Sequence, residues 1–526
     1  MDSNIINRAS VMAEFDADFI DKWFSLNAKS VKHHIDTLYY TVSVKGDCLD
    51  TSDAGMIALL SELDFLKQRK KAVYSDEIDF FGLNVEATGF STYEYHLSFP
   101  EVYDVFVASY LPNLQTPRIC VQIRSRSLVL DGVYKAIEKS YEKVVEILNE
   151  YGLEVDEVKE NRVDYAYHTN LIQNPMKYFS DAMLRRSLKS KMRKYMKIGA
   201  IGEDMTLETI SLGNRKSNNV FFRCYDKTKE VIDKGYKSFF FERWRDAKLI
   251  SEYDYFVYNI AYETHAYRTG ILLGRIAWYQ RYGTNEEIQA KLRSLVKSCY
   301  TDSDNAEHIE KELHGLLPEV TRIMNVEFQT KRKFYHSFEA QIKDIDVSFS
   351  CDDKLNRLFK VVYLRAAILD YLTSSQCVAF LKDRRAKLNK EVYLDWWRRI
   401  RACKIDEDET EEKELLRVHE RFVNREKAVR RVLNSLASFN IIDDGDGSDK
   451  TFMEDISDTL AYLNDNDIIE FRRADGKAAE INPKLYNGIR LRKLRQNRAL
   501  LVKRKEKVQE LREQHKKIID EDNSSE

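Results

Sequence analysis

The stretch NNVFFRCYDKTKEVID, residues 218–233, places a tyrosine where a strand is expected to meet a helix. Its first half is rich in aromatic and β-branched residues, which favour a strand, and its second half is rich in lysine and acidic residues. Alternation along a strand would put Arg223 and Tyr225 on the same face. Just upstream, TISLGNRKS carries a second strand and a turn at Gly213–Asn214, so the sequence predicts a β-hairpin followed by a charged helix.

The bulk composition describes a chain of more than one domain. The 526 residues are 43% hydrophobic and 32% charged, which is enough apolar material for cores beneath a highly charged surface. With only 6 prolines and 18 glycines, helix is expected to dominate. The net charge of −2 gives no global argument for nucleic-acid binding, so such a role would depend on local patches.

Cysteine usage and the start of the chain predict a cytoplasmic protein with no membrane partner. The seven cysteines have no CxxC spacing, which favours reduced thiols over a disulfide framework or a zinc site. The start, MDSNIINRASVMAEFDADF, is polar and acidic, unlike a signal peptide. No apolar run approaches the roughly 18 residues that a membrane span requires.

Residues 31–270 are predicted to form an α+β core, preceded by a helical lead-in over residues 1–30. Strand-like patterns occupy residues 33–44, 94–110 and 161–170, and a helix with a stop at Gly152 is expected between the last two. In RICVQIRSRSLVL, residues 118–130, isoleucine and valine alternate with polar residues, and Arg124 and Arg126 share the polar face. These arginines suit either a solvated surface or contacts to phosphates.

The remainder of the chain is expected to be mainly helical. Residues 271–403 are predicted to be a helical extension, and the charged run KIDEDETEEKE, which starts at Lys404, marks a domain boundary. Residues 404–487 are a candidate winged-helix module, because helices precede a hairpin that turns at Asp475–Gly476. Residues 488–526 are predicted to be a basic helix with an acidic, disordered tail.

Tyr225 is a candidate nucleophile. A phenol has a pKa near 10 and must be activated before it can attack a phosphate. Lys227 and Lys229, just beyond the tyrosine, could stabilise a phenolate and the negative charge that grows on a phosphodiester. The alternative is structural, since a tyrosine at the end of a strand commonly packs into a core.

Four residues are candidate ligands for a hard divalent cation, which prefers oxygen ligands and accepts an imidazole. In VDYAYH, Asp164 and His168 share one strand face, and in AYETHAYR, taken as a strand, Glu263 and His265 do the same. The alternatives are surface acids and histidines with structural hydrogen bonds. No HxH pair lies on a predicted strand, so the usual two-histidine metal site of nickases is absent.

Three segments of this sequence, in order, resemble the Rep_trans family of rolling-circle replication initiators. The family pattern has an R-[IL]-D-x-A-x-D strand, a hairpin ending in R-x-Y-[ND]-K-K-x-E, and a strand with an R-V-E-x-E-L-like run. The matching stretches here are RVDYAYH from Arg162, RCYDKTKE from Arg223 and AYETH from Ala261. NVEFQTKRKFY, from Asn325, and DWWRRIRACK, from Asp395, also resemble stretches of large initiators of this kind.

The resemblance implies an antiparallel-sheet, HUH-like nickase core and a tyrosine that cuts one origin strand. Tyr225 would form a 5′-phosphotyrosine and free a 3′-hydroxyl, assisted by Lys227 and Lys229. Mg²⁺ or Mn²⁺ would be held by Asp164, His168, Glu263 and His265. Origin DNA and a host helicase are the implied partners, and a homodimer is left open. The sequence departs from the family pattern at four positions. Ala261 replaces an arginine and His265 replaces a glutamate. His168 stands where a second aspartate is usual, and Thr228 replaces a lysine.

The resemblance also turns the basic residues into candidate DNA contacts, because contacts to phosphates position a protein on DNA. These candidates are Arg124, Arg126, Arg185, Arg186, Lys189, Lys191, Arg193, Lys194 and Arg223. Two alternatives stay open. One is a conjugative relaxase with the same chemistry, and the other is a non-catalytic DNA-binding initiator or regulator, favoured by the altered acidic stretch. If Tyr225 is buried and far from Asp164 and Glu263 in the structure, the enzymatic interpretation fails.

Overall fold

The computed structural model describes residues 14–26, 30–46, 53–73, 77–109, 117–201, 206–290, 292–293, 317–343, 345, 352–387, 390–403, 456–457 and 461. The chain divides into two compact units, residues 1–419 and 420–526. Nearly all the described residues belong to the first unit, which is the one described below. The predicted winged-helix module and basic terminal helix lie outside the described residues, apart from three isolated positions.

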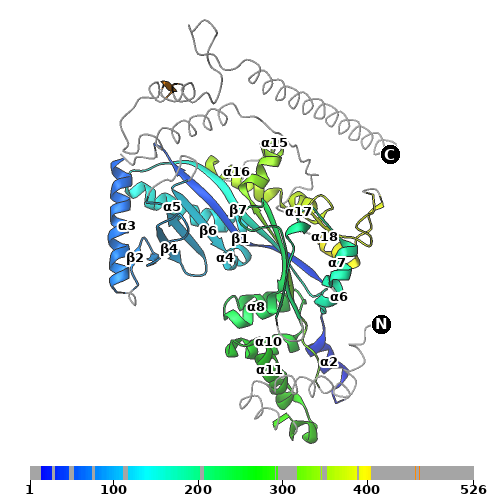
Figure 1. The fold of residues 1–526 in the computed structure, drawn as a ribbon. Coiled ribbons are helices and arrows are strands. Elements are labelled where there is room, and N and C mark those ends of the chain that lie inside the picture. The colour runs from blue at the N-terminus through cyan, green and yellow to red at the C-terminus, as the bar shows by residue number, and fades with distance from the viewer. Residues whose placement is uncertain are drawn as a thin grey trace, which may run out of the picture. The chain divides into compact units, whose positions relative to one another are not determined.

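The framework of the first unit is an eleven-stranded sheet with the order β2-β3-β4-β5-β6-β1-β7-β12-β11-β10-β9, shown in Figure 1. A second sheet pairs β13 with β8, and the neighbouring strands of both sheets are antiparallel. The predicted α+β class with an antiparallel sheet is therefore confirmed. The strands are β1 (Val31–Val44), β2 (Asp79–Phe80), β3 (Leu83–Val85), β4 (Tyr95–Phe99), β5 (Tyr103–Val107), β6 (Ile119–Arg124), β7 (Val155–Thr169), β8 (Leu188–Ser190), β9 (Lys197–Ile201), β10 (Thr206–Leu212), β11 (Val220–Asp226), β12 (Met324–Lys331) and β13 (Val378–Phe380).

Helices cover parts of both faces of the large sheet. The α-helices are α2 (Ala17–Phe24), α3 (Ala54–Ala72), α4 (Ser125–Leu130), α5 (Val133–Glu150), α6 (Pro175–Phe179), α7 (Asp181–Ser187), α8 (Lys227–Lys234), α9 (Phe239–Asp246), α10 (Glu252–Thr264), α11 (Tyr267–Tyr282), α14 (Arg332–Tyr335), α15 (Glu339–Lys343), α16 (Asn356–Tyr363), α17 (Arg365–Thr373) and α18 (Asp395–Arg401). The 3₁₀-helices among the described residues are η2 (Arg193–Tyr195), η4 (His336–Phe338) and η5 (Asp353–Leu355). None of the described helices combines the length and the apolar character needed to cross a membrane.

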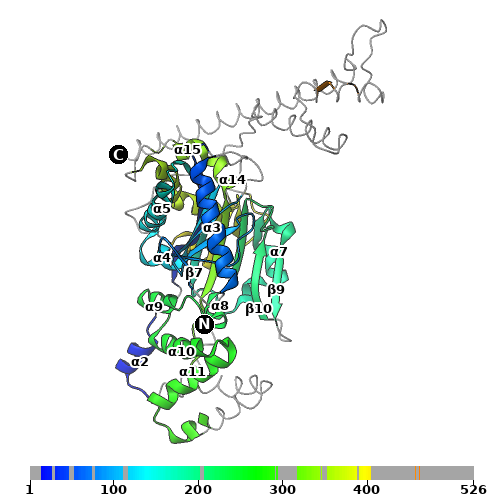
Figure 2. The ribbon, with the colours of Figure 1, turned by 90° about the vertical axis from the view of Figure 1, so that its left-hand side faces the viewer.

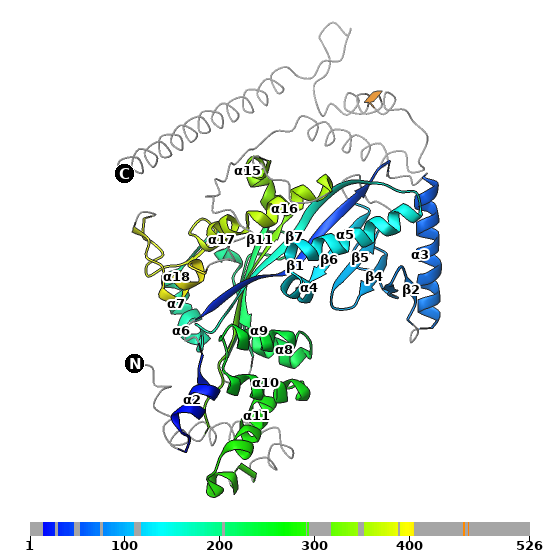
Figure 3. The same cartoon turned by 180° about the vertical axis from the view of Figure 1, so that it is seen from behind.

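The central strands have one apolar face and one polar face. On β7, Val163, Tyr165 and Tyr167 belong to the main hydrophobic core, together with side chains of α5, α16 and α17. Because side chains alternate along a strand, the residues between them, Asp164 and His168 included, face the other way. Figure 3 shows α8, α9, α10 and α11 on one side of the sheet and α5, α16 and α17 on the other. Figure 1 shows α3 beside β2 and β4, at one end of the sheet.

Strand β12 corrects the predicted domain plan. Residues 271–403 were expected to be helical, yet Met324–Lys331 lies between β7 and β11 in the middle of the sheet. Along β12, Val326 and Phe328 are fully buried. Met324, Val326 and Phe328 alternate with Asn325, Glu327 and Gln329, a period-2 pattern that is typical of a strand and that the prediction of a helical extension overlooked. The sheet therefore needs residues well beyond the predicted limit of 270.

The predicted hairpin and the strand-to-helix junction are confirmed. β10 and β11 pair antiparallel, and Gly213 in the connecting turn has a φ of 93°, which glycine adopts without strain. β11 ends at Asp226, whose carboxylate accepts a hydrogen bond from the Lys229 backbone N–H and so caps α8. Helix α8 stops at Gly235, which is left-handed with a φ of 62°.

The predicted strand AYETH is instead part of helix α10. Ser251 and Asp254 form a capping box at its start, and Val257, Tyr258 and Ala261 lie buried at helical spacing. Tyrosine and valine content suggested a strand, but the cap and the 3.6-residue period decide for a helix. Residues 125–130 differ likewise: β6 ends at Arg124, and Arg126 lies on α4 rather than on the polar face of a strand.

Candidate active site

Tyr225 is the penultimate residue of β11 and faces the polar side of the sheet. Its backbone pairs with Asn325 of β12, and that of Arg223 pairs with Glu327. The shared parity therefore gathers two β11 side chains and two β12 side chains on one face. The predicted pairing of Arg223 and Tyr225 on a common face is consistent with this register. The Arg223 guanidinium also lies over the Tyr225 ring, 4.7 Å from its centroid.

The Tyr225 hydroxyl is held by three polar groups. It donates a hydrogen bond to Glu327 Oε2 at 3.3 Å. It accepts hydrogen bonds from Asn325 Nδ2 at 2.8 Å and from Lys227 Nζ at 3.4 Å. A carboxylate that can take the phenol proton and two donors that can hold a phenolate oxygen are thus already in place.

The tyrosine is buried, with 7% of its surface exposed. Burial raises the pKa of the Tyr225 hydroxyl well above 10, and the Glu327 charge adds to this, while Arg223 acts in the opposite direction. The phenol is therefore protonated at neutral pH. This burial goes against the accessible nucleophile that an enzymatic interpretation requires. In its favour, a carboxylate lies within hydrogen-bond reach, although it comes from Glu327 rather than Glu263.

Lys227 is a buried cation between acidic groups. Its side chain is fully buried, with Nζ 2.6 Å from Glu230 Oε2 and 3.9 Å from Asp36 Oδ1. Burial opposes the charge, but Asp36 and Glu230 outweigh it and raise the pKa of Lys227. Asp36 sits at a β-bulge, since β1 shifts register against β7 between Ile35 and Thr37. The bulge turns a strand residue into the partner of this lysine.

Two bidentate arginine–carboxylate pairs lie side by side on the polar face. Arg223 Nε and Nη2 each donate to Glu327 at 2.8 Å, and Arg162 holds Asp164 in the same manner, with Nε 2.8 Å from Oδ1. Burial raises the pKa of Asp164 to about 6, with Arg162 acting against the rise. Asp164 pairs with Gln329 across β12, which makes it a diagonal neighbour of Glu327.

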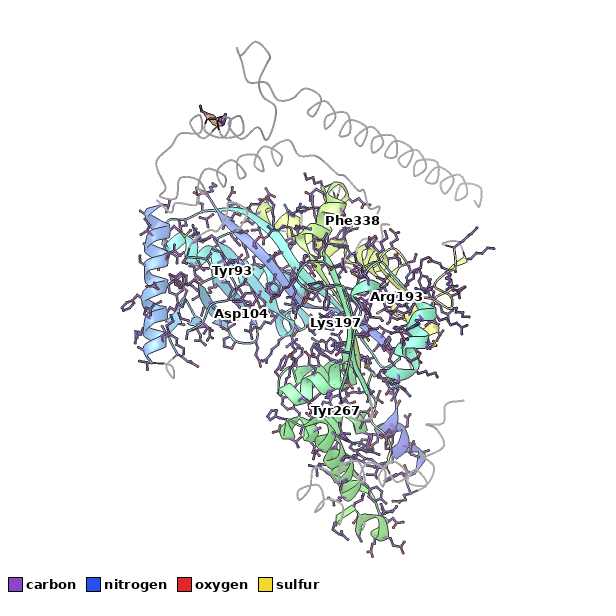
Figure 4. The ribbon with its side chains drawn as sticks, in the orientation of Figure 1. Tyr93, Asp104, Arg193, Lys197, Tyr267 and Phe338 are labelled. Atoms are coloured by element: carbon purple, nitrogen blue, oxygen red, sulfur yellow. The ribbon has the colours of Figure 1, made fainter. Side chains whose placement is uncertain are left out.

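A third pair of the same kind continues the polar face across the sheet. Arg124, on β6, donates to both carboxylate oxygens of Asp104, on β5, at 2.6 and 2.7 Å, and His96 contacts the same carboxylate at 2.9 Å. Figure 4 labels Asp104 in this half of the sheet. Exposed fractions of 40% for Arg124, 20% for Arg162 and 29% for Arg223 leave each guanidinium partly open to solvent. Arg126, in contrast, pairs with Glu101 at the surface.

The predicted four-ligand metal set is not assembled. Glu263 and His265 are exposed at the end of α10, and His265 caps that helix in a left-handed conformation. His168 is buried, and its Nδ1 accepts a hydrogen bond from Trp244 Nε1 at 2.9 Å. Within the described ranges, no group of three or more histidine, cysteine, aspartate or glutamate side chains could hold a metal ion. The change from strand to helix at Glu263 is the physical reason.

The predicted DNA contacts within residues 185–194 lie on the other side of the sheet from Tyr225, whereas Arg124 and Arg223 share its face. Phe222, which faces opposite to Tyr225 on β11, packs 6.3 Å from Phe380 on β13, and β13 pairs with β8. There Arg185 pairs with Asp181, Arg186 reaches the Lys382 carbonyl, and Lys189 pairs with Glu391. Lys191 and Lys194 are exposed, Arg193 is half-exposed, and their DNA contacts stay predictions. Lys229, on α8, is half-buried.

Sequence reasoning missed Asn325, Glu327 and the partners Asp36 and Glu230. One signal could have found Glu327: NVEF in residues 325–328 fits the family's R-V-E run better than AYETH does, apart from the missing arginine. This stretch falls within the predicted helical extension, but the structure places it on β12. Asp36 carried no signal, because only the bulge in β1 brings it to Lys227.

Comparisons with known proteins add little to this geometry. No family model matches the sequence, and no curated protein matches it. Among solved structures, a rolling circle replication initiator protein from Geobacillus stearothermophilus aligns with 71% of this chain and 96% of its own, at 11% identity and a TM-score of 0.30. A likeness this remote carries no argument about what the chain does.

Proposed function

We propose that this protein cuts and rejoins one DNA strand at an origin through a covalent bond between Tyr225 and a phosphate. The observation that carries the proposal is the hydroxyl of Tyr225, which touches a carboxylate that can accept its proton and two donors that can hold the resulting oxyanion. A buried tyrosine hydroxyl usually finds a hydrogen-bond partner, and that of Tyr225 has three polar partners of complementary chemistry. Here the partners include a lysine with no exposed side-chain surface.

In the proposed reaction, the phenol proton passes to Glu327 while the Tyr225 oxygen attacks the phosphorus. The bond from phosphorus to the 3′-oxygen breaks, and that oxygen takes a proton from solvent. The products are a 5′-phosphotyrosine and a free 3′-hydroxyl, and the reverse steps rejoin the strand. Lys227 and Asn325 stabilise the phenolate, whose formation burial otherwise disfavours.

Access to the hydroxyl requires Arg223 to move. This guanidinium covers the Tyr225 ring and is the partly exposed member of its pair with Glu327. An incoming phosphate would compete with the Glu327 carboxylate for the bidentate hydrogen bonds of the Arg223 guanidinium. When Arg223 turns toward the phosphate, Glu327 loses its counter-charge and keeps its contact with the phenol.

A divalent cation stays part of the proposal, with different ligands from those predicted. Mg²⁺ often uses one or two carboxylates and takes its other ligands from water and substrate phosphate. Asp164 and Glu327 fit this donor set as diagonal neighbours on one face, although each now holds an arginine. When bound, such an ion would polarise the scissile phosphate.

The test is a nicking assay with the supercoiled replicon or element that encodes the gene. Purified protein, Tyr225→Phe and Tyr236→Phe would be incubated with Mn²⁺ and uniformly labelled DNA, and adducts would be resolved on a denaturing gel. Tyr236 is the matched control, because its hydroxyl donates to Glu230 beside Lys227 yet lies outside the proposed chemistry. We expect an adduct with the wild type and with Tyr236→Phe, none with Tyr225→Phe, and none when EDTA is present.

A second candidate function is DNA binding without catalysis. The observation that favours it is that Tyr225 is buried and both neighbouring carboxylates already have arginine partners. Retarded DNA with no nick from any of the three proteins, in any divalent metal, would establish this candidate. An adduct that mass spectrometry assigns to a tyrosine other than Tyr225 would reject the proposed mechanism while keeping the enzyme.

A further inference from the structure

A cavity of about 620 Å³ lies beside the N-terminal half of β1. β6 pairs with β1 only from Thr37 onward, so among the described strands residues 31–36 have a partner on the β7 side alone. Helices α4 and α9 flank the open side, and Figures 2 and 3 both show them next to each other. Arg243 Nη2 donates to the Val129 carbonyl at 3.1 Å, which ties the two helices together.

The wall of the cavity carries three histidines with unused ring nitrogens. His33, His34 and His168 line it, and both nitrogens of His33 and the Nε2 atoms of the other two are buried without hydrogen-bond partners in the part of the chain that the structure describes. His168 is only 2% exposed. Because its Nδ1 accepts from Trp244, a neutral ring carries its proton on Nε2, which is a donor with nothing to donate to.

These imidazoles act as neutral hydrogen-bonding groups. Burial lowers the pKa of each of the three, most strongly for His33 and His168. An anion would gain little from the uncharged rings, although the buried Arg365 also lines the cavity. A purely apolar ligand would leave their nitrogens without partners, which is costly. No metal-binding group of three such side chains exists among the described residues. The wall therefore suits a ring that carries hydrogen-bonding atoms at its edge.

The rest of the lining adds aromatic surface inside and positive charge at the mouth. Phe240 and Trp244 line the cavity and stack on each other, with ring centroids 5.8 Å apart. Lys32 and Arg243 also line it, and both are exposed, as is the lining residue Asp246, whose carboxylate pairs with Arg245 at 3.1 Å. Aromatic side chains favour a flat heterocycle, and exposed cations favour a phosphate. Together with the neutral imidazoles, these features match a nucleotide.

The cavity shares a wall with the candidate active site. Lys227 Nζ lies 5.4 Å from the centroid of the Phe240 ring, and the same atom is 3.4 Å from the Tyr225 hydroxyl. On the other side, His34 Nε2 is 3.8 Å from Asp36 Oδ1, the second acidic neighbour of Lys227. A nucleotide seated in the cavity would therefore lie within a short reach of the tyrosine.

We infer that this cavity binds one nucleotide of the DNA strand close to the phosphate that Tyr225 attacks, with the base inside and the phosphate at Lys32 and Arg243. The inference rests on the proposed function for the identity of the strand, but the nucleotide site stands on the cavity itself. A base that leaves the DNA stack at this point would exchange stacking on its neighbours for contact with Phe240, Trp244 and the histidines.

The experiment measures binding of free nucleotides and needs no cleavage. Full-length protein would be mixed with each of the four 2′-deoxynucleoside 5′-monophosphates, and saturation-transfer NMR would report which ligand protons contact it. We expect transfer to base protons for at least one nucleotide. Deoxyribose 5-phosphate, the probe without a base, should bind at least tenfold more weakly.

Variants from both walls make the assignment specific. Ala247→Trp on the α9 side and Val129→Trp on the α4 side would fill the cavity, so each should reduce base-proton transfer at least tenfold. Glu242→Ala, an exposed change on α9 at a residue that does not line the cavity, should leave it unchanged. Circular dichroism would identify a variant that fails to fold. The tryptophan variant from the opposite wall would then test whether filling the cavity reduces nucleotide binding.

The outcomes separate this inference from the proposed function. Two results would overturn the nucleotide site even if the Tyr225 adduct forms. One is that no nucleotide shows transfer to its base protons. The other is that such transfer occurs but no folded cavity-filling variant reduces it. Base-proton transfer that the filling variants abolish, in a protein that never forms the adduct, would keep the nucleotide site and reject the nicking proposal.

Discussion

At the residue scale, the charge of Lys227 holds the site together. Its ammonium lies between Glu230 and Asp36, and these carboxylates and the lysine are mostly or fully buried. Removing one member of a buried ion pair leaves the other charges without compensation, which is more costly than the pair was worth. The same ammonium contacts the Tyr225 hydroxyl, so stability and the proposed chemistry depend on one atom.

We predict that Lys227→Met lowers the free energy of unfolding by about 3 kcal/mol. Lys234→Met is the matched control, because Lys234 is on the same helix, 58% exposed, and pairs with the same Glu230 at 3.4 Å. The control should lose less than about 0.5 kcal/mol. Urea denaturation of both variants measures this, and equal losses would contradict a buried, charged Lys227.

The pair of Asp164 with Arg162 gives a pH prediction with a definite sign. The pKa of Asp164 is about 6 in the folded protein, above the ordinary value of 3.8. A carboxyl whose pKa is higher in the folded than in the unfolded protein contributes its full stabilisation below the unfolded pKa. It loses that contribution as the pH rises through the folded pKa. The difference in unfolding free energy between wild type and Asp164→Asn should therefore fall between pH about 4 and 6, by about 2 kcal/mol.

Chemical denaturation of both proteins at several pH values from 4 to 7 measures that difference. Taking the difference cancels the titration of the groups that the two proteins share. A difference that rises with pH over this range would mean that the bidentate contact from Arg162 outweighs the burial of the carboxyl.

At the scale of elements, the junction between β11 and α8 aims Lys227 at Tyr225. Asp226 sits between them and makes three contacts: it caps the Lys229 N–H, accepts from the Thr228 hydroxyl at 2.7 Å and pairs with Arg322 at 3.0 Å. A helix that starts one residue later would carry Lys227 away from the phenol. The cap is therefore part of how the site is positioned.

We predict that Asp226→Ala costs about 1 to 2 kcal/mol of stability and slows formation of the Tyr225 adduct at least tenfold. Asp226→Asn keeps an oxygen for the cap but loses the charge that faces Arg322, so its effects should be smaller. Asp53→Ala removes the equivalent cap of α3, at the far part of the sheet, and should reduce stability alone. Adduct rates slowed equally by Asp226→Ala and Asp53→Ala would contradict a positioning role.

At the scale of the whole molecule, the sheet is completed by a strand from late in the chain. β12 separates β7 from β11 and supplies Asn325 and Glu327 to the site. Without it, β7 and β11 would each expose an unpaired edge in the middle of the framework. The candidate site and the sheet therefore form only when residues up to about 331 are present.

We predict that a chain ending at residue 270 does not fold, whereas a chain ending at residue 419, the limit of the first compact unit, does. Urea unfolding followed by circular dichroism should show no cooperative transition for the shorter chain and a single one for the longer chain. A cooperative transition of the chain ending at 270, with wild-type amplitude per residue, would contradict the role given to β12.

The sequence by itself determined the local features of this protein. Alternation and turn residues were sufficient for β1, β6, β7 and the β10–β11 hairpin, because these patterns act over a few residues. They were also sufficient for placing Tyr225 at the end of a strand, with Arg223 on the same face and Lys227 just beyond. The helix before β7 and its stop at Gly152 followed from the same short-range rules.

Only the tertiary structure decided which acidic groups meet the tyrosine. Helix α10 took Glu263 out of the site because a capping box and a buried helical stripe outweighed a strand-like composition. Glu327 entered from a strand about a hundred residues beyond Tyr225 in the chain, and Asp36 from a bulge near its start. Such contacts depend on strand order and register across the sheet, which are long-range properties that no local pattern encodes.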